Sequence, residues 1–366
     1  MRNRVGVGKR RGYVPGLDGL RAVAVLAVVI SHTWAQALPG GWVGVDVFFV
    51  LSGFLITSIL LSEHDRTGRI SFRSFYVCRA LRLLPALAVT LVLGVLIAYW
   101  LYPGSASDTL TEAFAAVFYV ANWLVALGGV HSGLLIHTWT LSIEEQFYWT
   151  WPVALYFLLM VGSRRVALAA TLLVLGVVVA HRLMGVSSFS FRTDTRADSL
   201  LMGCAVALAA SAGLIDLLST KIIRGAAVLA FVTLGLVLAG IQPMSMSGVG
   251  YTVVGVAAAT VVVSVALRPV RLAARALSWH PLTWIGQRSY GVYLYHPLCL
   301  ALLAPRLGTD GPAALAATLI FSTCAAAVSY HYVETPFLRL KERAKNRHET
   351  ATRAPDATAV EALRTA

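Results

Sequence analysis

The chain has 366 residues, of which 58% are hydrophobic and only 13% are charged, whereas a soluble domain has about 45 to 50% apolar and about 25% charged residues. With a mean hydropathy of +0.73, this composition excludes a soluble globular enzyme and indicates that the solvent of the chain is lipid. The formal net charge of +13 comes from clusters of Lys and Arg between apolar stretches, which is typical of membrane proteins and predicts no nucleic-acid partner.

Eleven apolar stretches approach the length of a membrane-spanning helix, which is about 20 residues because each residue rises 1.5 Å. In chain order they are Leu20 to Leu38, Trp42 to Leu61, Leu83 to Tyr102, Leu110 to Leu127, Ile143 to Val161, Val166 to Met184, Ser199 to Leu218, Gly225 to Ile241, Gly248 to Leu267, Ser289 to Ala304 and Ala313 to Val333. They do not alternate as barrel strands do. The sequence therefore predicts an all-α, polytopic membrane protein, and its scattered cysteines predict neither disulfides nor a metal site.

Lys and Arg indicate which stretches cross, because they stay on the cytoplasmic side. If Leu110 to Leu127 lies along the interface or re-enters, about ten helices cross and both termini are cytoplasmic. The Lys and Arg residues that then remain outside are Arg182, Arg192, Arg196 and Arg306. We expect residues 1–340 to form the membrane domain, residues 341–366 to form a disordered cytoplasmic tail, and no soluble domain to follow.

The first predicted helix contains Arg21 near its inner end and His32 in its outer half. A charged or imidazole group in lipid costs several kcal/mol, so each is a candidate functional residue. Asp46 lies on the opposite arm of a tight outer hairpin, where it can meet His32, hold one tautomer of the imidazole and stabilise its protonated form, as a general base requires. The alternatives are a snorkelling arginine and a pair that only neutralises charge.

The third predicted helix has Arg79 and Arg82 at its inner mouth, three positions apart and so on one face. Arginines at this place also satisfy the positive-inside rule without a further role. The functional interpretation is a clamp for phosphate groups, since the guanidinium fork fits them, with Arg21 joining from the first helix.

Two further polar groups stand at the outer starts of predicted helices. Glu144 and Glu145 follow an outer loop that begins at His137, and they are either helix caps or part of a site at the depth of His32. The run from Arg192 to Asp198 is either a salt-bridged loop or a second polar part of the site.

Seven motifs, in register from about residue 13 to 340, together resemble the membrane-bound acyltransferase family 3. They are Arg21 with His32, Gly44 to Gly53, Phe75 to Pro85, Trp139 to Tyr148, Arg196 to Gly203, Ser289 to Pro297 and Val333 to Phe337. Thr140 stands where the family usually has serine.

This resemblance implies transfer of an acyl group, usually acetyl, from coenzyme A to a hydroxyl of a cell-envelope glycan or of a secondary metabolite such as a macrolide. It also implies that His32 is the catalytic histidine, that Arg21 is essential, and that Arg79 and Arg82 lie near the donor, here acyl-CoA. The motifs add supporting or substrate-contacting residues, which are Arg196, Asp198, Tyr148, Tyr290 and His296.

The sequence thus predicts a multi-pass plasma-membrane O-acyltransferase with His32, Glu144 and Asp46 as catalytic residues and no permanently bound cofactor. Its partners are the lipid bilayer, acyl-CoA and a glycan or small-molecule acceptor. Its oligomeric state stays open. The rival hypothesis is a proton-coupled transporter, although the chain lacks paired halves with broken helices at matching positions.

Overall fold

The computed structural model describes residues 13–130, 132–185, 190–241 and 248–340. These residues form α-helices, short 3₁₀ turns and two π-helical turns, and they contain no β-strand. The predicted all-α class is therefore confirmed. The predicted disordered tail, residues 341–366, lies outside the described residues.

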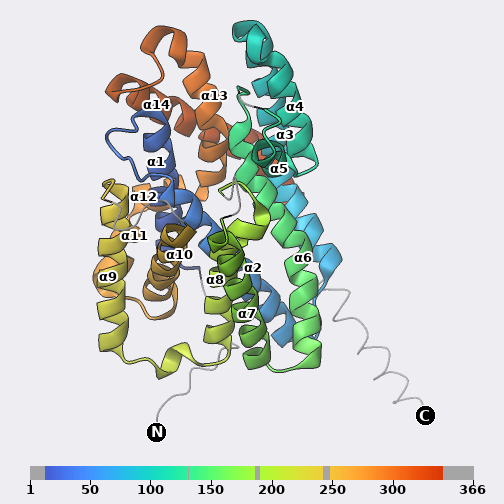
Figure 1. Cartoon of the computed structure of the whole chain (residues 1–366), viewed down its shortest axis with the longest axis vertical. Helices are drawn as coiled ribbons and strands as arrows, with labels where there is room; N and C mark the ends of the chain where they lie inside the picture. Colours follow the sequence, from blue (N-terminus) through green and yellow to red (C-terminus); the bar gives the residue numbers. More distant parts are fainter. Residues whose placement is uncertain (1–12, 131, 186–189, 242–247, 341–366) are drawn as a thin grey trace, which may run out of the picture.

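Figure 1 shows helices of very different lengths, many of them running along the long axis of the molecule. In chain order they are α1 (Pro15–Thr33), α2 (Val43–Thr67), α3 (Phe72–Leu101), α4 (Ala106–Val117), α5 (Ala121–Ala126), α6 (Trp139–Val161), α7 (Arg164–Leu183), α8 (Thr193–Ser211), α9 (Thr220–Leu238), α10 (Gly248–Val262), α11 (Arg271–Leu277), α12 (His280–Gln287), α13 (Ser289–Leu307) and α14 (Pro312–Ser329). The π-helical turns Val263–Leu267 and Tyr330–Glu334 extend α10 and α14.

Seven helices of the described chain are long and apolar enough to cross a membrane: α1, α2, α3, α7, α9, and α10 and α14 with their extensions. The sequence also predicts crossings at α6, α8 and α13. These three helices fall outside the seven, and each carries polar residues of the candidate site. The count of ten and the cytoplasmic placement of both termini stay predictions.

The stretch from Leu110 to Leu127 is not one continuous helix. It is divided between α4, with 12 residues, and α5, with 6 residues, and Tyr119 between them has a positive φ of 55°. Each piece is far shorter than the roughly 20 residues that a span needs. The expectation that this stretch does not cross as an ordinary spanning helix agrees with this geometry.

Apolar side chains cover much of the outer surface, as a lipid environment requires. Trp100 on α3, Leu173 on α7 and Leu229 on α9 are 75%, 70% and 68% exposed. In contrast, two thirds of the most apolar part of α1 and of α2 is buried inside the protein, so these two helices are interior elements. Figure 1 shows α9 and α6 on opposite flanks of the molecule.

Two glycines allow α2 and α8 to pack backbone against backbone. A Cβ atom on Gly53 would lie 1.9 Å from the carbonyl oxygen of Leu200, and one on Gly203 would lie 2.1 Å from that of Val50. Any side chain at these positions would push the helices apart, which is why small residues mark close contacts of membrane helices. This approach brings the first turns of the two helices, with their charged residues, together.

Prolines inside helices release backbone carbonyls, because proline has no N–H to give to the residue four positions earlier. Pro305 of α13 releases the carbonyl of Ala301, and the Tyr102 hydroxyl donates to that oxygen at 2.6 Å. Pro297 of the same helix releases the carbonyl of Tyr293, and a histidine of the candidate site fills that position.

The third helix begins earlier than predicted. Its cap is Ser71, whose side chain accepts from the N–H of Ser74, and the helix runs from Phe72 through Pro85 to Leu101. Hydropathy places the start at Leu83, because the preceding turns are too polar for lipid. Arg79 and Arg82 therefore lie within α3 rather than at its mouth.

Candidate functional site

Two histidines from α1 and α13 form the centre of the candidate site. His32 Nδ1 lies 2.8 Å from His296 Nε2, and the two rings are stacked with an angle of 11° between their planes. Valines of α1 pack against Val292, Tyr293 and Tyr295 of α13, and this apolar contact fixes the two rings.

Pro297 of α13 leaves a free carbonyl that indicates which ring nitrogens of His296 and His32 carry protons. His296 Nδ1 lies 2.7 Å from the carbonyl oxygen of Tyr293, and a carbonyl only accepts, so this nitrogen carries the proton. In a neutral ring the Nε2 of His296 then holds a lone pair and accepts from His32 Nδ1–H. His32 Nε2 is left with its own lone pair, as a general base requires.

The two rings differ in their access to the surroundings. His296 is fully buried, whereas His32 is exposed, one residue before the end of α1. A substrate can therefore reach His32 without opening the fold, and the orientation of His32 is set from the buried side.

A third histidine, His137, lies beside His296 in the turn Ile136–Thr138. Its ring centroid is 5.9 Å from that of His296 and 5.6 Å from that of Tyr293. Its side chain is buried, and neither ring nitrogen has a hydrogen-bond partner among the described residues. Burial, and the neighbouring His32, lower the pKa of His137 to about 3, so this imidazole is neutral at physiological pH.

The Tyr293 hydroxyl connects this cluster to the start of α6. It donates to the carbonyl oxygen of His137 at 2.9 Å, and it lies 2.7 Å from the hydroxyl of Thr140. Thr140 thereby supplies a buried hydroxyl contact at the start of α6.

Three arginines gather nearer the N-terminal end of α1. Arg82 is close enough to interact electrostatically with both Arg21 and Arg79, as predicted from their positions along α1 and α3. Arg79 is already engaged: it contacts Glu145 at 2.6 Å, and its guanidinium lies 3.4 Å above the Tyr148 ring. Arg82 is exposed and makes no salt bridge within the described chain.

Glu144 lies between the arginines and the histidines. Its carboxylate accepts from the Ser52 hydroxyl at 2.6 Å, and it interacts electrostatically with Arg79 and Arg21 on one side and with Tyr293 on the other. Glu144 and Glu145 stand in the second turn of α6 and do not cap it.

Asp46 does not pair with His32, contrary to the sequence prediction. Its carboxylate contacts Arg196 at 3.1 Å and accepts from Ser199 at 2.9 Å, because the close packing of α2 on α8 turns this face of α2 away from α1. The partner of His32 is His296. Asp46 is fully buried and neutralises Arg196, which also lies 4.0 Å above the Tyr251 ring.

The run from Arg192 to Asp198 forms salt bridges, which agrees with the first of its two predicted possibilities. Arg192 and Asp194 form a partly exposed salt bridge at 2.7 Å, whereas Asp198 is fully buried and contacts Arg182 at 2.8 Å. Three of the four arginines predicted to lie outside are thus paired with carboxylates, which reduces the cost of their unusual position. None of these residues contacts the histidine cluster in the described structure.

Tyr290 links two helices of the site, because its hydroxyl donates to the carbonyl oxygen of Leu83 at 3.0 Å. It thereby fixes α13 beside the arginine-bearing part of α3. Within the described residues, no group of three or more His, Cys, Asp or Glu side chains is arranged to hold a metal ion.

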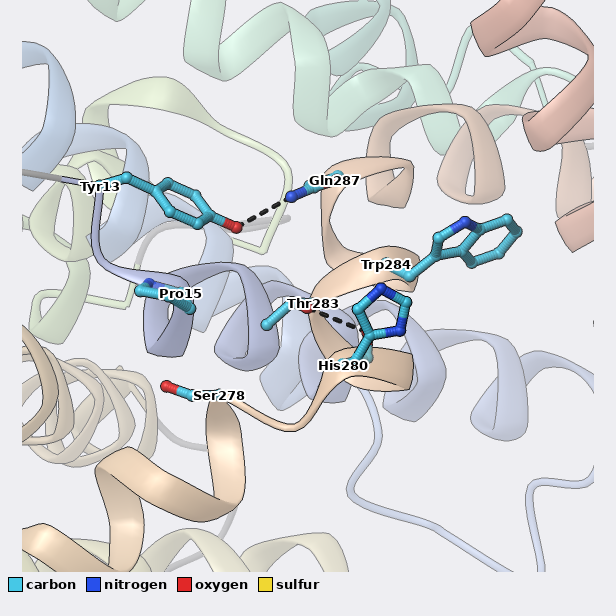
Figure 2. Close-up of a pocket in the computed structure, with 7 residues that line it drawn as sticks. All are labelled: Tyr13, Pro15, Ser278, His280, Thr283, Trp284 and Gln287. Carbon is cyan, nitrogen blue, oxygen red and sulfur yellow. Dashed lines mark hydrogen bonds between the residues drawn. The ribbon is translucent and has the colours of Figure 1, made fainter.

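Figure 2 shows a cavity of about 290 Å³ beside the start of α1, lined by Tyr13, Pro15, Ser278, His280, Thr283, Trp284 and Gln287. Gln287 donates to the Tyr13 hydroxyl at 2.9 Å, and that hydroxyl donates to Asp18 at 2.7 Å. Asp18 in turn lies 3.6 Å from Arg21. The cavity is therefore joined to the arginine cluster by a continuous set of polar contacts.

Sequence reasoning missed Tyr293 and His137 as members of the histidine cluster. Tyr293 lies three positions before His296 on one helix and therefore shares its face, a spacing that was visible in the sequence. His137 gave no such indication, because a histidine in an outer loop is ordinary until the fold shows that it is buried.

Known proteins resemble this chain over most of its length. A family model described as an acyltransferase domain matches residues 14–331. The peptidoglycan O-acetyltransferase OatA of Listeria monocytogenes is 33% identical over 89% of this chain and 56% of its own length. The O-acetyltransferase OatA of Staphylococcus aureus is 35% identical over 88% of this chain and 57% of its own length. This chain thus spans about half the length of these relatives, and no solved structure matches it.

Proposed function

The chain belongs to the family of membrane acyltransferase domains, as its motifs indicate, and is a multi-pass protein of the plasma membrane; we propose that it transfers an acyl group, here acetyl, to a hydroxyl of a cell-envelope glycan. The observation that carries this proposal is the hydrogen-bonded series from the Tyr293 carbonyl through His296 to His32. It leaves the exposed His32 Nε2 as a proton acceptor, and a poorly nucleophilic hydroxyl requires one.

In the proposed reaction the acceptor hydroxyl attacks the acyl carbonyl carbon while its proton moves to His32 Nε2. The developing imidazolium is stabilised through Nδ1–H by His296. When the tetrahedral intermediate collapses, His32 returns the proton to the leaving group. His296 is a positioning residue in this scheme, and Glu144 lies where it can stabilise charge between the two ends of the site. An acyl-histidine intermediate on His32 is the alternative route.

We propose acyl-CoA as the donor. Arg82 is exposed and has no salt-bridge partner in the described structure, so its planar fork is available for a phosphate. Arg21 and Arg79 add positive potential beside it. Eleven residues of α1 separate Arg21 from His32, roughly 16 Å along the helix, so a donor bound by its phosphates needs a long arm to bring a thioester to the histidine. Coenzyme A has such an arm.

The cavity of Figure 2 suits the heterocyclic base of this nucleotide. It lies on the arginine side of α1 and offers aromatic, amide and hydroxyl groups, which can stack on a planar base and form hydrogen bonds with its edge. The phosphates would then continue toward Arg21, to which the cavity is joined through Asp18.

Among acceptors, the names of the relatives favour peptidoglycan over a macrolide or another secondary metabolite. They also disfavour the transporter hypothesis, because a transporter would leave the acyl group on its donor. Since the relatives are nearly twice as long, we propose acyl transfer for this chain with the acceptor class assigned by similarity.

The direct test incubates purified protein in lipid nanodiscs with ¹⁴C-acetyl-CoA and soluble peptidoglycan fragments. We expect label on fragment hydroxyls that alkali removes as acetate. The proposal would be contradicted if the protein formed no ester with peptidoglycan, lipopolysaccharide or macrolide acceptors and released no acetate from the donor.

A further inference from the structure

His137 is the buried imidazole that the proposed reaction does not yet use. Its position is fixed through its backbone: the hydroxyls of Tyr293 and Thr140 both donate to its carbonyl oxygen, at 2.9 and 3.2 Å. The ring itself is 3% exposed, and neither nitrogen has a hydrogen-bond partner within the described residues.

An unsatisfied buried polar group lowers the stability of the folded state by about 1 to 3 kcal/mol. A fold that retains such a group therefore uses it in its function or binds a ligand there. The ring lies near the backbone carbonyl of Leu294, which favours the protonated imidazole, but the contact falls short of hydrogen-bond geometry. The ring N–H is therefore at most weakly engaged within the described residues.

The location of the ring suggests what it would contact. It packs edge-on against His296, the partner of His32, and it is close enough to His32 for the two rings to interact electrostatically. His137 therefore belongs to the same cluster of rings as the proposed base. A neutral imidazole in such a place donates through one N–H without adding charge.

We propose that His137 is a catalytic residue that donates a hydrogen bond to the acyl oxygen during transfer, an inference that rests on the proposed function. As the acceptor oxygen bonds to the carbonyl carbon and its proton passes to His32, the carbonyl electron pair moves onto the acyl oxygen, where the His137 N–H meets it. When that pair returns, the carbon–sulfur bond breaks, and the thiolate takes the proton from His32. Charge balances at each step, and no further reactant is needed.

The test uses purified full-length protein in nanodiscs, acetyl-CoA and a peptidoglycan disaccharide-peptide. His137→Phe keeps a flat ring but has no N–H, and His137→Asn and His137→Gln keep an N–H donor. We expect His137→Phe to lower kcat by about 10² to 10³, as loss of one oxyanion donor does, while KM for acetyl-CoA stays within about twofold. The amide variants should recover at least about tenfold of this loss.

Two controls separate chemistry from packing. His181→Phe makes the same change at a histidine of α7 that pairs with Asp194 of α8 and lies outside the cluster. This variant should keep the wild-type kcat. His137→Phe should melt at or above the wild-type temperature, because it removes an unsatisfied buried polar group. The pH profile of His137→Gln should keep its shape because His32 remains the base. A kcat of His137→Phe within about twofold of the wild type, or equal losses in all three variants with lowered melting temperatures, would overturn the assignment. An inactive wild type would instead refute the proposed function itself.

Discussion

The His32 imidazole is bonded at Nδ1 and open at Nε2, and this asymmetry separates a base from a pair that only neutralises charge. The partner at Nδ1 is a neutral ring whose own proton is held by a backbone carbonyl. A carboxylate partner would stabilise the imidazolium more strongly. The histidine partner fixes the tautomer with less charge stabilisation, so the imidazolium returns its proton more readily.

At the scale of residues, the sequence selected His32, Arg21, Arg82 and His296 from residue type and motif, and their functional roles stay predictions. The structure tests only their contacts. The pairing of Asp46 was wrong, because helical rise gives the depth of a residue but not its direction around the helix axis. Direction depends on which helix packs on which face, and Gly53 and Gly203 decide that only in the folded chain.

Glu112 gives a pH-dependent prediction outside the spanning helices. Its Oε2 accepts from the Leu135 N–H at 2.7 Å, and burial raises its pKa to about 7. Between its unfolded value near 4.5 and 7 the folded state holds the extra proton, so stability should fall as pH rises through this range. Glu112→Gln should flatten the dependence in melting curves from pH 5 to 8. An equally steep curve in the variant would contradict this role.

Arg82 tests the donor site. We expect Arg82→Lys to raise KM for acetyl-CoA more than it lowers kcat, because lysine keeps the charge but loses the two-pronged contact with phosphate. Arg268→Lys, at the exposed pair with Asp216, is the matched control and should be silent. An unchanged KM in well-folded Arg82→Lys would leave this arginine as a topology determinant.

Prolines within the helices shape the site at the next scale. Pro152 of α6 releases the Tyr148 carbonyl, which lies 3.4 Å from the Tyr76 hydroxyl that donates to it, and the Pro297 and Pro305 positions of α13 follow the same pattern. In lipid a freed carbonyl needs such a replacement donor. At Pro152, Pro297 and Pro305, a side chain from the same or a neighbouring helix supplies this donor.

The elements themselves were largely predictable. Apolar length identified the helices, and the polar composition of Leu110 to Leu127 correctly set it apart. Helix ends were less predictable: α3 continues inward by about three turns beyond its apolar part, since helices extend through the membrane surface wherever capping and packing allow.

Pro297→Ala tests whether the proline positions the base. It restores an N–H at position 297, which competes with His296 for the Tyr293 carbonyl and weakens the tautomer preference. We expect kcat to fall by about tenfold or more, given the roughly 10⁴ that a wrong tautomer costs in a serine-protease triad, with equal or higher melting temperature. Pro305→Ala, on the same helix but bonded to Tyr102, should leave kcat unchanged. Wild-type turnover in Pro297→Ala would show that the proline is only structural.

On the scale of the whole molecule, the arrangement runs across the bundle. The arginines and the cavity lie toward the start of α1, the histidines lie at its end, and Glu144 lies between them. A donor and an acceptor can therefore approach from opposite ends, provided that the start of α1 faces the cytoplasm. Charge distribution predicts this orientation, but helix geometry alone does not determine it, because a bundle packs identically in either direction.

Cysteine labelling in intact cells tests the orientation. Single cysteines between Glu63 and Arg73 and in the C-terminal tail should react only after the membrane is made permeable. Cysteines between Gly128 and Leu135 should react from outside. Labelling of this last segment only from the cytoplasm would contradict the predicted topology and place the histidines on the inner side.

The most direct measurement of the central claim is the turnover of His32→Ala. The variant should insert, melt like the wild type and bind acetyl-CoA, but lose about 10² to 10⁴ in kcat, the usual contribution of a positioned base. If transfer is direct, incubation with labelled acetyl-CoA alone should leave no label on the wild-type protein. Label that is retained on the wild type and is absent from His32→Ala would indicate an acyl-histidine. Near-normal transfer by correctly inserted His32→Ala would contradict the account, because the histidine would then only satisfy His296 within the bundle.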